Sequence, residues 1–232
     1  MSSYNLLKGH DIRLKGNPKK DIIDIPLSTH IAIHPSQYKG MKPKLLVKKG
    51  DSVKVGSPIF YDKTKESVKV VSTASGTIED IVLGKRRIVE KVVIKVDGDE
   101  SESLSIDKSE NFKDFLLDSG LWSYLRQRPF SKVPDPDIRP RAIFLSLHQT
   151  SPFSIDLEYL LKDSKKEIVD GLKLLSTLTD GNVFLTLKKG SDFLNDLDLD
   201  SNVNVNYFSG LVIGVKPLNI IQVHIYHIIS FF

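Results

Sequence analysis

Short apolar runs separated by turns dominate residues 40–96. Val92, Ile94 and Val96 recur at every second position, as in a strand with one buried face. Glycine and proline in the turns supply backbone geometry that β-branched residues disfavour. The pattern predicts a compact all-β sandwich or barrel. Its other expected strands are Leu45–Val47, Val53–Val55, Ile59–Tyr61, Val68–Val71 and Ile78–Val82.

Beyond residue 111 the apolar spacing changes. Apolar residues at helical spacing over 112–127, interrupted at Gly120, predict two short helices. Four prolines between residues 129 and 140 then predict a stiff, extended connector. Strands alternate with helices after the connector, which predicts an open α/β domain with a mainly parallel sheet. The expected strands are 142–147, 182–187 and 203–208, and the expected helices are 155–162 and 165–178.

The predicted organisation has four parts. Residues 1–39 form a polar lead with one short strand, and residues 40–111 form the all-β domain. Residues 112–140 form the helical and proline-rich connector, and residues 141–232 form a partial α/β domain. From residue 211 the sequence is strongly apolar, with Lys216 as its only formal charge. An uncovered apolar tail of this kind favours association.

Composition narrows the function classes. The 232 residues carry a net charge of +4, with 33 basic and 29 acidic residues mixed along the chain, so nucleic acid is not an implied partner. Basic patches in the N-terminal half would equally suit an anionic membrane surface. Cysteine is absent, which excludes disulfides, thiolate nucleophiles and cysteine-ligated clusters in this chain. No stretch has the roughly 20 uncharged apolar residues of a spanning helix, and the start lacks a signal peptide.

The stretch from Gly40 to Val96 resembles the barrel-sandwich hybrid domains, the fold of biotinyl and lipoyl carriers. In those carriers a lysine at a hairpin tip holds the prosthetic group. Lys65 is nearest to that place, and Lys63 competes with it. One interpretation of the chain is therefore a carrier module with Lys65 as the modified residue, and the other is that Lys65 is a solvated hairpin charge.

Four sequence blocks together resemble the A subunit of the sodium-translocating NADH:quinone reductase, the Nqr complex. The run Arg-Pro-Phe-Ser-Lys-Val-Pro after Ser-Gly-Leu-Trp is the most specific of them, and the resemblance covers roughly residues 6–210. The blocks are Lys8–Gly16, Gly40–Pro43, Gly84–Arg87 with Val92–Ile94, and Ser119–Pro134 followed by Pro140–Phe144.

This resemblance implies a peripheral protein on the cytoplasmic face of the bacterial inner membrane, within a respiratory complex that couples electron transfer from NADH to quinone with sodium export. It implies that this chain has no catalytic residue, metal site or covalent cofactor. Ubiquinone is the substrate, and NADH, flavins and the iron–sulfur centre belong to partner subunits. A purely structural scaffold is a further interpretation.

Two family segments associated with quinone match His34–Met41 and Phe130–Asp137 here. A quinone ring needs a flat apolar face and hydrogen-bond donors for its carbonyl oxygens. The expected face comes from Tyr38, Met41 and Phe130, and the expected donors are Ser131 and Lys132. The alternative is that Phe130 anchors the connector onto the barrel while Arg126 and Arg128 contact a neighbouring subunit.

The resemblance weakens at Gly210, where Leu-Val-Ile-Gly-Val replaces the family's Pro-His-Pro-Ala-Gly segment. Family members continue into a β-grasp domain and a helical region. The sequence is therefore expected to be a C-terminally truncated member, from a shortened product or a damaged reading frame.

Overall fold

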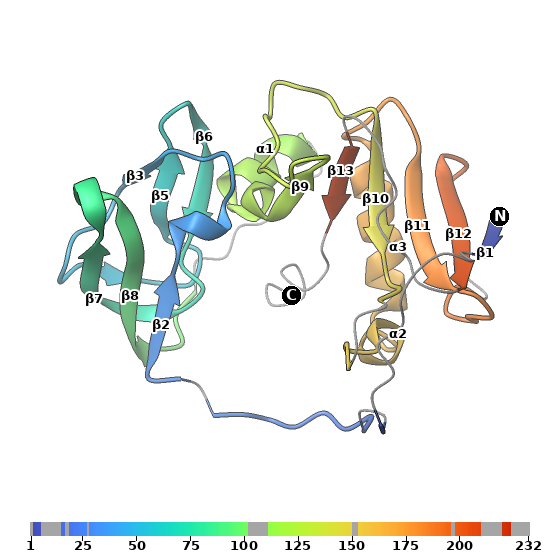
Figure 1. The fold of residues 1–232 in the computed structure, drawn as a ribbon, viewed down its shortest axis with the longest axis horizontal. Helices are drawn as coiled ribbons and strands as arrows, with labels where there is room; N and C mark the ends of the chain where they lie inside the picture. Colours follow the sequence, from blue (N-terminus) through green and yellow to red (C-terminus); the bar gives the residue numbers. More distant parts are fainter. Residues whose placement is uncertain are drawn as a thin grey trace. The chain divides into compact units, whose positions relative to one another are not determined.

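The computed structural model describes residues 2–5, 15–16, 19–26, 28–101, 111–149, 153–195, 198–209 and 220–223. The chain divides into two compact units (Figure 1). The β-rich unit comprises Asp24–Arg126 and Phe130–Ile138. The α/β unit comprises Met1–Ile23, Gln127–Pro129 and Arg139–Phe232, so its residues come from both sides of the β-rich unit in the sequence.

Two antiparallel sheets build the β-rich unit (Figure 1). The four-stranded sheet has the order β2-β8-β7-β4, and the three-stranded sheet has the order β3-β5-β6. The first sheet consists of β2 (His30–Ile33), β8 (Val89–Gly98), β7 (Ser75–Leu83) and β4 (Ser52–Val53). The second consists of β3 (Pro43–Leu45), β5 (Pro58–Asp62) and β6 (Lys65–Val71). The predicted all-β fold of this region is confirmed.

The core of the β-rich unit is made by the inward-facing positions of these strands. Ile78 of β7 and Ile94 of β8 are register partners and both are fully buried. Complete burial of one such side chain contributes about 1.5–3 kcal/mol to stability. The other fully buried apolar residues of the two sheets include Ile59, Phe60, Val68, Val70 and Val92.

Of the two short helices predicted over residues 112–127, one is confirmed. The first is α1 (Phe112–Asp118), whose N-cap Asn111 accepts a hydrogen bond from the Lys113 N–H. After Gly120 the chain forms only a 3-10 turn, η3 (Leu121–Tyr124), and then strand β9 (Leu125–Gln127). Proline disfavours the helical conformation in the residue before it, so Pro129 discourages a helix through this region.

The α/β unit has a parallel sheet, as predicted. Its strand order is β1-β12-β11-β10-β13. The strands are β10 (Ala142–Ser146), β11 (Val183–Lys188), β12 (Val203–Ser209), β13 (Ile220–Val223) and β1 (Ser2–Asn5). Strand β1 was not predicted, because Ser-Ser-Tyr-Asn has no apolar alternation. It pairs with β12, with Ser2 opposite Asn206.

Helix α3 (Lys165–Ser176) packs against this sheet through Val169, Leu172 and Leu175, which are buried (Figure 1). The helix predicted at 155–162 is shorter, because only α2 (Leu157–Leu160) is helical after its N-cap Asp156. Apart from β13, the apolar tail beginning at residue 211 lies outside the described residues. Among the described helices, none has the length and apolar character needed to cross a membrane.

Candidate functional site

The two segments predicted to contact quinone lie together in the β-rich unit. The Val133 N–H donates a hydrogen bond to the Lys39 carbonyl oxygen at 2.8 Å. The side chain of Lys132 packs over Gly40 so closely that a Cβ there would lie 3.2 Å from the Lys132 Cβ. A short 3-10 turn, η1 (Pro35–Gln37), shapes the first segment. Residues almost 100 positions apart in sequence therefore form one surface.

Phe130, Ser131 and Lys132 form the outer part of that surface. The Phe130 side chain is 76% exposed, so it does not anchor the connector onto the barrel. Ser131 has a positive φ of 55°, which is uncommon for a residue other than glycine. Lys132 is exposed, whereas Met41 and Ser131 are half-buried. An exposed aromatic ring and two potential donors thus lie next to one another in the chain.

Tyr38 is placed differently from these residues. It is only 6% exposed, and its ring meets Phe60 and Tyr124 edge-on at centroid distances of 5.7 Å and 6.3 Å. Burial raises the pKa of Tyr38, and burial also raises the pKa of Tyr124, with which it shares a hydrogen bond. Tyr38 therefore packs beneath the exposed residues of this surface. Because its pKa is raised, its phenol is neutral.

Arg126 and Tyr124 accompany Tyr38, and the sequence reasoning assigned neither of them to this cluster. Arg126 is half-buried and donates through Nη1 to the carbonyl oxygens of Ser123 at 2.6 Å and Leu125 at 2.9 Å. Burial lowers the pKa of Arg126, while the two phenols oppose that shift. The sequence feature that could have indicated this cluster is the mixture of tyrosine, arginine and apolar residues over 121–128.

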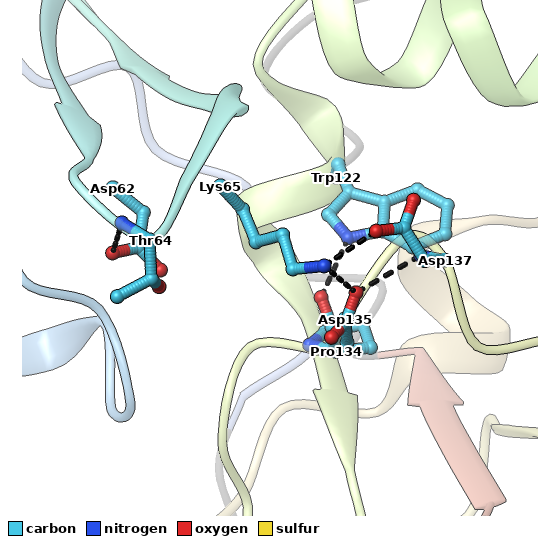
Figure 2. Close-up of polar contacts among 7 residues, drawn as sticks. All are labelled: Asp62, Thr64, Lys65, Trp122, Pro134, Asp135 and Asp137. Carbon is cyan, nitrogen blue, oxygen red and sulfur yellow. Dashed lines mark hydrogen bonds and ion pairs between the residues drawn. The ribbon is translucent and has the colours of Figure 1, made fainter.

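Lys65 holds the proline-rich segment against the barrel hairpin (Figure 2). Its ammonium group forms an ion pair with Asp135 at 3.3 Å and a close ion pair with Asp137. Hydrogen bonds to Asp137 and Asp135 raise the pKa of Lys65, and the bond to Lys65 lowers the pKa of Asp137. These three residues, which we call the lysine clamp, fix the segment that carries Phe130.

Trp122 adds a second attachment to the same segment. Its indole N–H donates to the Pro134 carbonyl oxygen at 2.9 Å, and its side chain is 2% exposed (Figure 2). Asp62 stabilises the nearby β5–β6 turn by accepting hydrogen bonds from the N–H groups of Lys42 at 3.0 Å and Thr64 at 3.1 Å. Residues 130–138 of the proline-rich connector are therefore a packed part of the β-rich unit.

The lysine clamp makes Lys65 a poor attachment point for a prosthetic group. Lys65 is the first residue of β6, beyond the hairpin turn, and its amine is engaged by two carboxylates. A carrier lysine must be free and nucleophilic to be acylated. Lys63, the competing candidate, is exposed in the turn. The carrier interpretation with Lys65 as the modified residue is therefore not favoured.

We expect the protein to have the mass of its unmodified sequence when it is produced in a cell that contains lipoylating and biotinylating enzymes. Hydrogen bonds to Asp137 and Asp135 raise the pKa of Lys65, which lowers the fraction of the neutral amine that acts as a nucleophile. Intact-mass spectrometry, followed by mapping of the peptides that hold Lys63 and Lys65, measures this directly. A lipoyl or biotinyl adduct on either lysine would restore the carrier interpretation.

A second polar cluster lies at the carboxyl ends of β10 and β11 in the α/β unit. The Ser191 hydroxyl donates a hydrogen bond to Glu158 Oε2 at 2.7 Å. The Phe193 N–H donates a hydrogen bond to Ser191 Oγ at 3.2 Å. Burial lowers the pKa of His148, the charge of Lys188 adds to that effect, and Glu158 opposes it. His148 Nε2 and Glu158 Oε1 are buried without a hydrogen-bond partner among the described residues. Nothing in the sequence pattern singled out this cluster.

Both parts of the chain match known domain families. Residues 4–97 match the NqrA N-terminal barrel-sandwich hybrid domain, and residues 107–231 match the NqrA second alpha/beta domain. The predicted combination of a barrel-sandwich hybrid with an α/β domain is thereby confirmed.

Curated relatives are named as the A subunit of Na(+)-translocating NADH-quinone reductase. The chain is 37% identical over 231 residues to the one from Marinomonas sp. (strain MWYL1), covering 96% of this chain and 50% of the relative. It is 38% identical over 230 residues to the one from Psychromonas ingrahamii (strain DSM 17664 / CCUG 51855 / 37), covering 95% and 50%. The relative from Yersinia pestis is 37% identical over 227 residues, covering 94% and 49%.

The chain thus spans about half the length of the curated relatives it matches. The match to the second domain alone covers more than half of this chain, and the first domain precedes it in the order that the sequence resemblance predicted. With both domain matches in register, the chain belongs to the NqrA family.

Proposed function

We propose that this chain acts as part of one subunit of a sodium-translocating NADH:quinone reductase, where it contributes to quinone binding. The observation that carries the proposal is the joining of segments 34–41 and 130–137 into one surface by the Val133–Lys39 hydrogen bond and the Lys132–Gly40 contact. The names of the relatives supply the reaction class. In this proposal the chain is not catalytic alone.

The proposed quinone surface uses the exposed part of the cluster. Phe130 supplies a flat apolar face, and the Ser131 hydroxyl and Lys132 ammonium donate to the quinone carbonyl oxygens. Met41, which is half-buried, lines the edge. Tyr38 is too buried to offer its ring face, so its proposed role is to support the segment beneath the ligand.

Preorganisation supports this assignment. The lysine clamp and the Trp122–Pro134 hydrogen bond hold the segment just beyond Val133. A loop that is already ordered loses less conformational entropy when it binds a ligand. The same rigidity would suit a scaffold role within the complex, so direct measurement of quinone binding is the deciding experiment.

In this proposal the chain depends on partner subunits for its cofactors and lies at a membrane surface. NADH, flavins and the iron–sulfur centre would be held by other subunits, consistent with the absence of cysteine from this sequence. The chain would lie peripherally at the cytoplasmic face of the bacterial inner membrane. Its partners would be the other subunits and ubiquinone, without nucleic acid.

We expect Phe130→Ala to weaken ubiquinone-1 binding about tenfold, because it removes the apolar face that stacks on the ring. The sequence contains one tryptophan, Trp122, which is bonded to the segment that holds Phe130. Quenching of its fluorescence by ubiquinone-1 therefore reports binding in this region. The unfolding midpoint of the variant should be unchanged, because the side chain is exposed.

Phe153→Ala is the matched control, since Phe153 is also an exposed phenylalanine but lies in the α/β unit. Its ubiquinone-1 affinity should equal that of the unaltered chain. Tyr38→Phe, which removes the buried hydroxyl and keeps the ring, should change the affinity less than Phe130→Ala. Equal affinities for Phe130→Ala and the unaltered chain would remove this surface from the quinone site.

A further inference from the structure

The turn between β7 and β8 carries a concentrated positive charge. It contains the 3-10 turn η2 (Lys85–Arg87), three consecutive basic residues that are all exposed at the end of the hairpin formed by β7 and β8 (Figure 1). Lys91 adds a fourth basic residue nearby, against a single acid, Glu90. We call residues 83–91 the basic tip.

Acidic neighbours do not neutralise the basic tip. Within the described part of the chain, Lys85, Arg86 and Arg87 form no ion pair. The two acids of β7 are engaged elsewhere: Glu79 contacts His30 at 3.0 Å, and Asp80 contacts Lys49 at 3.8 Å. The carboxylate of Glu90 packs against the backbone of Gly84, at the base of the turn.

Two exposed apolar side chains flank the three cations. Ile88 is 62% exposed and Leu83 is 47% exposed, on either side of the turn. Single exposed apolar residues are ordinary, but here both lie beside basic residues that form no ion pair with any described residue. Cations next to exposed aliphatic side chains are typical of peptide segments that lie in the headgroup region of a bilayer.

The backbone gives the basic tip a defined shape. Arg86 and Arg87 have positive φ angles of 57° and 58°, which are uncommon for residues other than glycine. The turn is closed by the Gly84 N–H donating to the Ile88 carbonyl oxygen at 2.8 Å and the Arg87 N–H donating to the Gly84 carbonyl oxygen at 3.2 Å. Strained backbone of this kind is concentrated at functional sites.

We propose that the basic tip docks on an anionic phospholipid surface, with Lys85, Arg86 and Arg87 at the lipid phosphates and with Ile88 and Leu83 at the boundary between headgroups and acyl chains. Charge complementarity selects an anionic surface. The apolar pair favours a lipid over a nucleic acid, since the basic tip has no aromatic residue on which bases could stack. This surface is separate from the proposed quinone site in sequence and composition, so its test is independent of that function.

The test is flotation of the full chain with vesicles of phosphatidylcholine mixed with phosphatidylserine, compared with vesicles of phosphatidylcholine alone. We expect binding to the mixed vesicles and its loss in high salt, because surface charge is screened. Arg86→Gln with Arg87→Gln should weaken binding about tenfold or more, as each cation near an anionic leaflet contributes severalfold. Ile88→Ser should weaken it further by a smaller factor.

Two control variants test whether a loss of vesicle binding is specific to the basic tip. Lys166→Gln with Lys173→Gln makes the same charge change on exposed positions of α3, and Ile155→Ser removes an isoleucine of similar exposure in the α/β unit. Both controls should bind the mixed vesicles as the unaltered chain does. Far-ultraviolet circular dichroism of the full chain checks that each variant is folded.

Three outcomes would overturn the proposal. These are equal binding to both vesicle types, equal losses in the basic-tip and α3 variants, and tighter binding of a DNA duplex than of the mixed vesicles. A loss confined to the basic-tip variants, with ubiquinone-1 affinity retained, would support it.

Discussion

Gly76→Ala is expected to destabilise the β-rich unit by about 3 kcal/mol or more. A Cβ at Gly76 would overlap the carbonyl oxygen of Lys95 on the neighbouring strand β8. That atom belongs to the backbone, so it cannot move aside as a side chain does. Relief requires β7 and β8 to separate locally, where Gly76 is the register partner of Val96. For a unit of this size, the melting temperature should fall by roughly 10 °C.

Gly98→Ala provides the control on the same strand pair. A Cβ at Gly98 would meet only the Ser75 Cβ, at 3.7 Å, which is ordinary van der Waals contact. We expect its unfolding free energy to change by less than about 1 kcal/mol. Urea unfolding followed by Trp122 fluorescence measures both variants within the β-rich unit. Similar stabilities for the two variants would show that β7 and β8 can separate at Gly76 without penalty.

Trp122→Ala should cost about 3–5 kcal/mol of folding free energy, the range found when a large buried aromatic side chain is truncated. Trp122 is almost fully buried and also donates its indole N–H to Pro134. Its removal leaves a cavity and detaches the proline-rich segment from the barrel. Because the variant lacks tryptophan, far-ultraviolet circular dichroism during urea unfolding is the suitable measurement.

Trp122→Phe separates the cavity from the hydrogen bond. Phenylalanine keeps much of the apolar volume but leaves the Pro134 carbonyl oxygen without its donor, a loss of about 1–3 kcal/mol. We expect its stability to lie between those of the unaltered chain and Trp122→Ala. If both variants are equally unstable, the hydrogen bond and not the packed volume dominates, and the expected order is wrong.

Local pattern was sufficient to predict several strands in each unit, including β5, β7, β10, β11 and β12. The apolar runs at Ile59–Tyr61 and Ile78–Val82 lie within β5 and β7, because short apolar runs bounded by turns are typical of strands in a packed sheet. Strand β1 was missed for the opposite reason. Its four residues are all exposed, and only pairing with β12, about 200 positions away, makes them a strand.

The candidate site was predictable in its segments and not in its contacts. The family resemblance selected 34–41 and 130–137, but exposure separates Phe130 from Tyr38, and no local pattern distinguishes an exposed aromatic ring from a buried one. The ion-pair partners of Lys65 could not be predicted from the sequence either. Asp135 and Asp137 lie about 70 positions further along the chain and meet Lys65 only because Trp122 and Val133 dock the segment.

The pairing of β1 with β12 also has a consequence for synthesis on the ribosome. Strand β12 is completed about 200 residues after β1, which takes roughly 10–40 s at ordinary rates of translation. During that interval every residue of the β-rich unit emerges, so its two sheets can close while β1 still waits for a partner. Strand β1 is therefore made long before its partner, and a nascent chain halted before residue 203 would present a folded β-rich unit while β1 still lacks β12.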